Sequence, residues 1–541
     1  MSDSPVSKEV KVEHNSPEVG DLEAGDRTII VHAAPLARQL KGRHLQMIAI
    51  GGAIGAGLFV GSGSALSTGG PGSLVLGYMI IGSMLLVTVQ ALGEMAVLYP
   101  VNGAFFTYIV RFVDPSVGFA VGWDYAIGWL TVLPFELTAA GITIKFWRDD
   151  INIGVWITIF LVFLTVIQIF GIKGYGEVEF FLSMIKIMGC IGFIILGVII
   201  DCGGTGPQGY IGAKYWHHPG AFANGFKGFC SVFVVAAFAF GGTELVGLAA
   251  AETADPKRSI PTATKQVFWR ITFFYVVGLF ILGLIVPHDN PDLLNSSGAN
   301  TKYSPFVIAI RLANIKVLPS IFNAIITISV ISVANSCTFG STRTMQALAE
   351  RGMGPAFLAY VDKQGRPVWG VLIQLLFGLL AFIGESGRSS TVFNWLLALS
   401  GLSFFFTWGA ICVAHIRFRS AWKIQGHIKD ELPYQAMFGV IGSWYGLILN
   451  ILCMVATFYV ALFPIGGSPN AQNFFSYYLA APLIIALYVF WKIWSRGSSF
   501  YVRAADMDIT SGKRQIDLAD DYVPTPKTWK NMPIRVFHAL F

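Results

Sequence analysis

IAIGGAIGAGLFVGSGSAL, residues 48–66, is an apolar run long enough to enter a bilayer, yet six of its residues are glycine. FVVAAFAFGGTELVGLAAAE, residues 233–252, is a second such run, with Gly241 and Gly242 at its middle and Glu244 just after them. Each glycine costs a helix roughly 1 kcal/mol relative to alanine. We therefore expect both membrane helices to be broken at their glycines, where freed backbone N–H and C=O groups bind a polar ligand.

Close packing of neighbouring helices is the alternative use of such glycines, and it accounts for Gly61 and Gly63. It explains less well why the densest glycine runs fall in the first and the sixth apolar runs of the chain. These positions correspond if two halves of five helices repeat with inverted topology. Paired glycine interruptions in matching halves indicate the binding site of a transporter.

The rest of the chain is also built from apolar runs. Of its 541 residues 54% are apolar and only 13% are charged, whereas about a quarter of the residues in a soluble domain are charged. A helix needs about 20 apolar residues to cross the hydrocarbon core. Twelve runs qualify: 45–67, 73–98, 117–143, 153–171, 177–200, 226–250, 267–286, 318–340, 368–384, 391–414, 444–464 and 474–494.

These runs predict an all-α integral membrane protein with twelve transmembrane helices, arranged as an inverted five-helix repeat plus two extra helices. The helical domain would span residues 41–494. Residues 1–40 would form a disordered cytoplasmic N-terminal tail, because they lack hydrophobic periodicity, and residues 495–541 a cytoplasmic C-terminal tail. The runs leave no room for a separate globular domain.

The net charge of +6 reflects the placement of basic residues on one side of the membrane. If the N-terminus is cytoplasmic, the inside segments contain 28 of the 37 lysines and arginines. This imbalance follows the positive-inside rule and predicts that both termini lie in the cytosol. A nucleic-acid-binding surface is the weaker interpretation.

Ionisable residues inside the spans are candidates for function, because each costs roughly 2.5–3.5 kcal/mol on insertion. Lys186 lies deep in the fifth run; burial disfavours its charged form, so it could exchange a proton, or it could be a structural cation. Glu244 follows the sixth-run break and could bind the backbone, the substrate amine or a proton. Glu136 follows Pro134 in the third run and could face the substrate path or hold a neighbouring helix.

The expected breaks suit a zwitterion. The N-terminus of a half-helix carries about half a positive charge, and with free N–H groups it can hold a carboxylate. Freed carbonyls can accept the three donors of an α-ammonium group. An amino acid at the membrane midplane needs both kinds of partner.

Five motifs, in order, resemble those of fungal amino-acid permeases of the amino acid–polyamine–organocation superfamily, and the resemblance runs from about Leu40 to Phe541. They are GGAIGAGLFVGSG (51–63), VLPFELTAA (132–140), FAFGGTELVGLAAAETADPKRSIP (238–261), NSCTFGSTRTMQALAERGMGP (335–355) and FNWLLALSGLSFFFTWGAICVAHIRFR (393–419).

The resemblance implies alternating access and a set of site residues. The substrate carboxylate would meet N–H groups around Ala56 and Gly57, Phe238 would be a gating aromatic, and Lys186 would replace a bound sodium ion. Together with the intramembrane charges, this gives Lys186 and Glu244 as the candidate proton-coupling residues. The candidate substrate-binding residues are Ile54, Gly55, Ala56, Gly57, Phe238, Ala239, Gly241, Glu244, Glu136, Ser400 and Ser403.

The leading functional hypothesis is import of amino acids across the plasma membrane by proton symport, with broad, neutral-leaning specificity. The alternatives are exchange of one amino acid for another and a non-transporting amino-acid sensor on the same scaffold. An enzyme is not expected, because no span or loop shows a nucleophile–base pair, metal-ligand spacing or a phosphate loop. We expect no cofactor and no metal. The expected partners are an amino acid, a proton and the lipid bilayer.

Five further positions invite predictions. Cys202 and Cys230 flank one outside loop and could form a disulfide in an oxidising exterior. Asn295 begins an Asn-Ser-Ser glycosylation sequon on an outside loop. The family resemblance suggests that Lys8 and Lys11 accept ubiquitin from a ligase or its adaptor.

Overall fold

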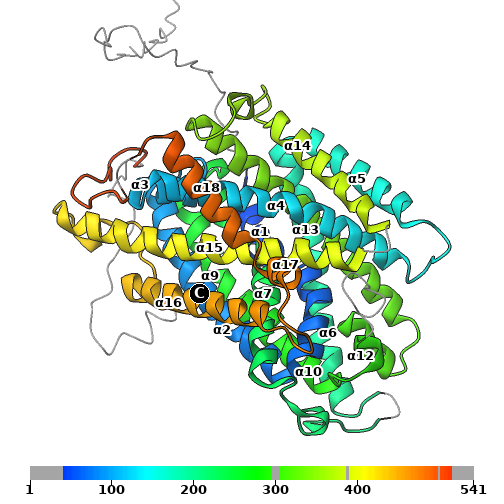
Figure 1. Cartoon of the computed structure of the whole chain (residues 1–541). Helices are drawn as coiled ribbons and strands as arrows, with labels where there is room; N and C mark the ends of the chain where they lie inside the picture. Colours follow the sequence, from blue (N-terminus) through cyan, green and yellow to red (C-terminus); the bar gives the residue numbers. More distant parts are fainter. Residues whose placement is uncertain (1–39, 206–207, 295–303, 386–388, 498–499, 514–541) are drawn as a thin grey trace, which may run out of the picture. The chain divides into compact units, whose positions relative to one another are not determined.

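The structure is a computed structural model that describes residues 40–205, 208–294, 304–385, 389–497 and 500–513. Across these ranges the chain is helical and contains no strand, apart from one isolated bridge between Leu40 and Thr253 (Figure 1). The predicted N-terminal tail lies almost entirely outside the described residues.

The helices follow one another along the chain with short connections. In order they are α1 (Gly42–Gly51), η1 (Gly57–Gly61), α2 (Ser62–Leu98), α3 (Ala104–Phe112), α4 (Pro115–Ile144), α5 (Ile153–Ile169), α6 (Gly171–Asp201), η2 (Trp216–Gly220), α7 (Gly225–Phe240), α8 (Leu245–Leu248), η3 (Ala249–Glu252), α9 (Pro256–Arg270), η4 (Ile271–Val277), α10 (Gly278–Ile285), α11 (Pro291–Leu294), α12 (Pro305–Leu312), α13 (Leu318–Glu350), η6 (Ala356–Ala359), α14 (Val368–Gly378), η7 (Leu379–Glu385), α15 (Ser389–Ile424), η8 (Lys429–Glu431), α16 (Gly439–Leu462), α17 (Ala471–Tyr478) and α18 (Ala480–Trp494).

Eight helices of the described chain are long and apolar enough to cross a membrane, and three shorter apolar helices accompany them. All twelve predicted runs coincide with helices. The first two runs are joined, because residues Gly57–Leu98 form one continuous helical stretch. That stretch bends at Gly70, whose φ of 81° lies in the left-handed region, just before Pro71. The protein is thus an all-helical membrane protein with at least eight spans.

Both predicted helix breaks are confirmed. In the first run, α1 ends at Gly51 and the chain resumes a helical path only near Gly57, where a π-helical turn leads into α2. In the sixth run, α7 ends at Phe240. Gly241 is extended, with a ψ of 139°, and Gly242 has a φ of 99°, so helix resumes at α8. Each break leaves backbone groups without their helical partners.

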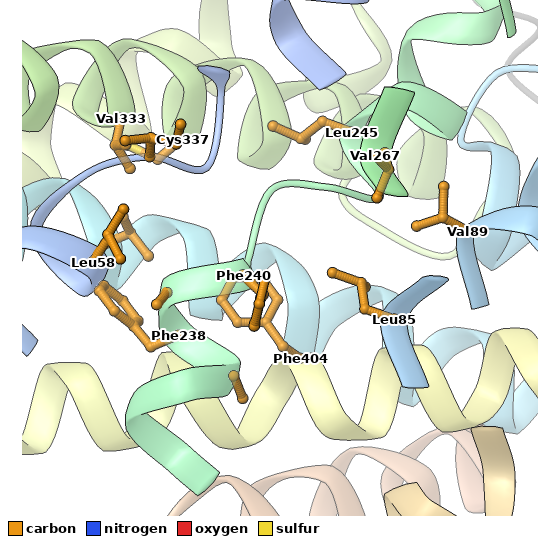
Figure 2. Close-up of a cluster of buried hydrophobic side chains, with 14 of the residues drawn as sticks. Leu58, Leu85, Val89, Phe238, Phe240, Leu245, Val267, Val333, Cys337 and Phe404 are labelled. Atoms are coloured by element: carbon orange, nitrogen blue, oxygen red, sulfur yellow. The ribbon is translucent and has the colours of Figure 1, made fainter. Parts of the chain in front are cut away.

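The breaks lie where several helices meet. Helix α4 packs against α13 and α15, while α2 packs against α7 (Figure 1). Apolar side chains from four of these elements gather around the breaks (Figure 2): Leu58 follows the first break, Phe238 is in α7, Val333 in α13 and Phe404 in α15. This cluster excludes water from the breaks on several sides.

Part of the predicted C-terminal tail is folded against the helices. The Val502 N–H donates to the carbonyl of Val113 at 2.9 Å, and the Tyr99 hydroxyl donates to the carbonyl of Ile509 at 2.7 Å. Met507 and Ile509 are each 3% exposed. Residues 500–513, which we call the C-terminal strap, therefore cover the side of the molecule that the charge pattern assigns to the cytosol.

Candidate functional site

A small cavity lies between the two breaks. It is lined by residues from both broken runs and from α4, α13 and α15, namely Ala53, Gly55, Gly57, Trp129, Val132, Glu136, Phe238, Gly241, Val333 and Phe404. The structure thus brings together five of the predicted site residues: Gly55, Gly57, Glu136, Phe238 and Gly241. Ile54, Ala56 and Ala239 are their buried chain neighbours. The other aromatic and aliphatic lining residues, Trp129, Val132, Val333 and Phe404, have no distinctive sequence signal.

Close approach of the two breaks requires glycine at Gly57. A Cβ added there would stand 2.5 Å from the Cα of Ala239, a backbone atom that cannot move aside. A Cβ on Gly55 would meet the side chain of Val333, and one on Gly241 would meet the ring of Phe404. The glycines therefore allow close contact between helices as well as the helix breaks. Both interpretations of the glycine runs, helix interruption and close packing, apply.

Glu136 is the only ionisable side chain that lines the cavity in the described chain. It is 1% exposed, and neither of its carboxyl oxygens has a hydrogen-bond partner among the described residues. The carboxyl group lies beside the N–H of Ala56 at the first break. An ionised carboxylate without partners is costly to bury, so the surroundings of Glu136 favour its neutral form.

Lys186 does not line the cavity; it binds the end of the first half-helix. Its Nζ donates to the carbonyl of Gly51 at 2.6 Å and to the hydroxyl of Ser332 at 2.8 Å, and it lies 3.4 Å from Glu179 Oε1. A cation at a helix C-terminus is stabilised by the helix dipole. Lys186 therefore joins α6 and α13 to the end of α1.

Glu179 is a buried partner that the sequence reasoning missed. Besides Lys186, its carboxylate accepts hydrogen bonds from Ser183 at 3.0 Å and from Ser332 at 2.8 Å. A signal was present, because Glu179 and Lys186 are seven residues apart and so share one face of a helix. Glu179 lies at the start of the fifth predicted run, 177–200, so it did not stand out as a charge inside a span.

Glu244 lies behind the second break and does not line the cavity. It accepts hydrogen bonds from the hydroxyl of Tyr125 at 3.0 Å, the indole of Trp408 at 3.1 Å and the N–H of Gly242 at 3.1 Å. These three hydrogen bonds fix the position of the carboxyl group. Glu244 thus ties the unwound turn of the sixth run to α4 and α15.

Ser400 and Ser403 are also buried away from the cavity. The Ser400 hydroxyl lies within hydrogen-bond distance of Gly128 O (3.1 Å), Thr131 Oγ1 (2.9 Å) and Leu396 O (2.9 Å). The Ser403 hydroxyl donates to its own helix, at the carbonyl of Leu399. Both serines lie at the packing interface of α15 with α4.

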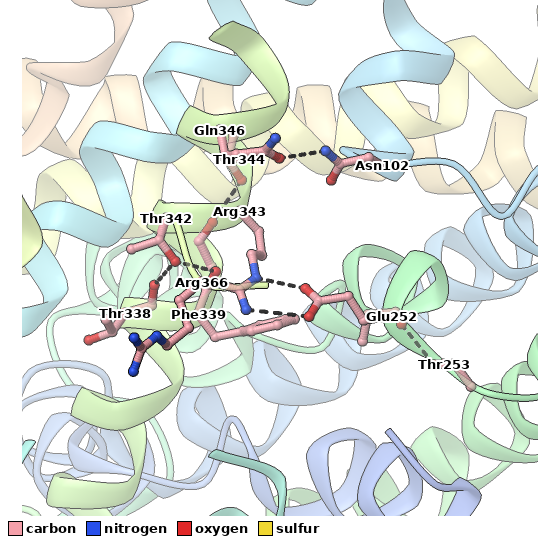
Figure 3. A network of polar contacts seen from close by, with 12 residues as sticks. Asn102, Glu252, Thr253, Thr338, Phe339, Thr342, Arg343, Thr344, Gln346 and Arg366 are labelled. Atoms are coloured by element: carbon pink, nitrogen blue, oxygen red, sulfur yellow. Dashed lines mark hydrogen bonds and ion pairs between the residues drawn. The ribbon is translucent and has the colours of Figure 1, made fainter. Parts of the chain in front are cut away.

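A buried ion pair joins the sixth run to α13, on the side assigned to the cytosol (Figure 3). Arg343 Nε lies 2.6 Å from Glu252 Oε1 and Arg343 Nη2 lies 3.3 Å from Glu252 Oε2, so the guanidinium contacts both oxygens. Asn102 donates to Gln346 at 2.5 Å one turn further along α13. The ion pair holds the sixth run to α13, and the Asn102 hydrogen bond joins the loop before α3 to the same helix.

Several predicted sites are not formed or lie outside the described chain. The predicted disulfide is wrong for this structure: Cys202 is exposed at the end of α6, Cys230 is buried in the body of α7, and both thiols are free. Asn295, Lys8 and Lys11 lie outside the described residues. The described chain contains no group of three potential metal ligands.

Comparisons with known proteins give one consistent result. Residues 44–499 match the family model described as "Amino acid permease". General amino-acid permease GAP2 of Candida albicans is 53% identical over 498 residues, covering 92% of this chain and 84% of that protein. General amino-acid permease GAP1 of Saccharomyces cerevisiae is 51% identical over 502 residues, covering 92% and 83%.

Two further matches extend the comparison. Cationic amino acid transporter 1 of Schizosaccharomyces pombe is 52% identical over 501 residues, covering 91% of this chain and 84% of that protein. A crystal structure of the manganese transporter of Eremococcus coleocola matches with a TM-score of 0.53 and 14% identity, covering 84% of this chain and 94% of that one. The last match shows a shared fold.

Proposed function

This chain belongs to the amino acid permease family, and from that premise we propose that it imports amino acids across the plasma membrane by proton symport. Membership makes it a multi-pass membrane transporter rather than an enzyme. The proposal adds twelve spans in two inverted five-helix halves plus two helices, with both termini in the cytosol.

The observation that supports this proposal best is that both helix breaks open onto one cavity. At the first break, the helix that starts near Gly57 offers its unpaired N–H groups and positive end to the substrate carboxylate. At the second break, Gly241 interrupts the helix and exposes carbonyl groups to the substrate ammonium. A free α-amino acid matches this pair of backbone sites without any charged side chain.

Proton coupling is proposed from the partners of the buried charges. Two buried cations, Lys186 and Arg270, lie near the breaks with two carboxylates that accept hydrogen bonds, Glu179 and Glu244. The carboxyl oxygens of Glu136 have no hydrogen-bond partner among the described residues, so this carboxyl group suits the role of carrying the transported proton. This assignment moves the coupling role from Glu244, which is held by three donors, to Glu136.

The cavity lining supports broad, neutral-leaning selectivity. Trp129, Val132, Phe238, Val333 and Phe404 form an apolar and aromatic wall, which suits side chains that differ in shape but carry no charge. Import of cationic amino acids is the second candidate, because an ionised Glu136 would attract a basic side chain and one relative is named a cationic amino acid transporter. Competition by all twenty amino acids against a labelled neutral amino acid would separate these candidates.

The full chain in proteoliposomes provides the decisive test. We expect an inward pH gradient to drive accumulation of a labelled amino acid, together with proton entry that depends on the amino acid. Uptake that requires a preloaded amino acid and moves no proton would establish exchange instead. Binding without uptake would establish a sensor.

A further inference from the structure

The seventh predicted run contains a π-helical turn, η4, which begins directly after Arg270 and includes Tyr275. In an α-helix, residues five apart point about 140° away from each other. The wider π-helical turn reduces this angle, and such turns are frequent at functional sites. Arg270 is 1% exposed and Tyr275 is fully buried. Both side chains reach the two helix breaks, although neither lines the cavity.

Arg270 bridges the two breaks from the proposed cytoplasmic side. Its Nη1 donates to the carbonyl of Ala49 in the last turn of α1 at 2.6 Å, and its Nη2 donates to the hydroxyl of Thr243 in the unwound turn. The Thr243 hydroxyl in turn donates to the carbonyl of Phe240 at 2.7 Å, so its lone pairs are free to accept from Arg270. No carboxylate of the described chain lies within ion-pair distance of this guanidinium. Its charge is matched by the negative end of α1.

Tyr275 bridges the same two breaks at a second level. Its hydroxyl lies 2.8 Å from the carbonyl of Ala239 and 3.3 Å from the carbonyl of Ala53. Ala53 lines the cavity. The tyrosine ring is stacked on Phe240, with a centroid separation of 4.2 Å and an interplanar angle of 26°. The hydroxyl has a single proton for two carbonyls, so it holds one carbonyl of each break within reach of the same donor.

We propose that Arg270 and Tyr275 are positioning residues that keep the two breaks in register, so that carbonyl groups from both breaks face the substrate ammonium together. The inference rests on the proposed amino-acid site and concerns how that site is assembled. Without the two bridges each break would move independently, and the substrate would have to order both of them on binding, which lowers affinity.

The first test is Tyr275→Phe, which removes only the bridging hydroxyl. Loss of one such hydrogen bond corresponds to roughly a three- to tenfold rise in the KM for a labelled neutral amino acid, with surface amount and Vmax little changed. Tyr78→Phe is the matched control: Tyr78 is another buried tyrosine, stacked 6.2 Å from Tyr275, and its hydroxyl has no hydrogen-bond partner within the described part of the chain. A merely structural role would lower the amount of transporter and leave KM unchanged.

The second test uses the two acceptors of Arg270. Arg270→Lys keeps the charge but cannot fork to both acceptors, so we expect it to raise KM, and Arg270→Met to raise it further. Thr243→Val combined with Tyr275→Phe should raise KM by less than the product of the single effects. Both variants weaken the same alignment of the two breaks, so their effects are not independent.

The outcomes separate the inference from the function on which it rests. A wild-type KM in Tyr275→Phe, or effects of Thr243→Val and Tyr275→Phe that simply multiply, would overturn the register role while leaving transport intact. Absence of amino-acid uptake by the wild-type chain would instead overturn the proposed function.

Discussion

Glu136 and Glu244 are both buried inside the helix bundle, but only Glu244 is provided with hydrogen-bond donors. At the scale of single residues this difference assigns their proposed roles. A carboxyl group that accepts three hydrogen bonds is fixed in place and can hold a helix break open. A carboxyl group without such partners can be buried at low cost only when it is neutral. Under the proposed mechanism, Glu136 takes up a proton when its surroundings become dry and releases it when they become wet.

The first prediction is that Glu136→Gln uncouples transport from the proton. Glutamine has the shape of the neutral carboxylic acid but cannot ionise. We expect the variant to exchange amino acids across proteoliposomes at a substantial rate, and to lose accumulation driven by a pH gradient. Counterflow and gradient-driven uptake measured on the same vesicles check this expectation. Normal accumulation in Glu136→Gln would remove Glu136 from the coupling mechanism.

The second prediction concerns Gly57. Gly57→Ala places a Cβ 2.5 Å from the Cα of Ala239, so the two breaks have to separate and uptake should fall at least tenfold. Gly192→Ala is the control, because a Cβ on that α6 glycine meets nothing within 4 Å. It should transport normally and stabilise its helix by up to roughly 1 kcal/mol. Equal uptake by both variants, at equal surface amounts, would contradict the close contact of the breaks.

At the scale of elements, the sequence could predict the breaks but not the groups that hold them. Glycine density and a following acidic residue are local signals, and they located both interruptions. The contacts of Lys186, Arg270 and Tyr275 with those breaks join residues that lie 27 to 222 positions apart along the chain. Such contacts depend on helix packing and on a π-helical turn, and neither of these leaves a periodic pattern in one sequence.

The third prediction concerns the ion pair between the sixth run and α13. Glu252→Gln leaves the charge of Arg343 buried without a partner, which costs about 3–5 kcal/mol. We expect a clear fall in the thermal unfolding temperature of the purified protein in detergent. Asp150→Asn breaks the exposed pair with Arg148 instead and should leave the unfolding temperature unchanged. Equal behaviour of the two variants would show that the buried pair adds no stability.

At the scale of the whole molecule, the residues after the last span are partly integral to the fold. The predicted C-terminal tail contains the C-terminal strap, which hydrogen-bonds Val113 and Tyr99 and buries Met507 and Ile509. No pattern in the sequence predicts this, because residues 500–513 have neither a long apolar run nor a helical period. Several of their contacts are made by backbone carbonyls, such as those of Val502 and Ser511, which accept hydrogen bonds from Arg417 and Arg111.

The fourth prediction is that the strap stabilises the transporter. A chain that ends at Gly497 exposes the apolar surface that covers Met507 and Ile509, so its unfolding temperature in detergent should fall. A chain that ends at Lys513 keeps the strap and should unfold like the full chain. If both truncated chains unfold at the same temperature, the strap contributes nothing to stability.

The bend at Gly70 has a mechanical consequence. Residues Gly57–Leu98, which follow the first break and include the second predicted run, form two helical arms that meet directly at the non-helical Gly70. A Cβ at Gly70 would stand 2.7 Å from the carbonyl of Ala221. The bend is therefore packed tightly against the backbone of the segment before α7. We therefore expect a movement of the backbone near Gly57, where the substrate is proposed to bind, to be transmitted to the helical arm that ends at Leu98.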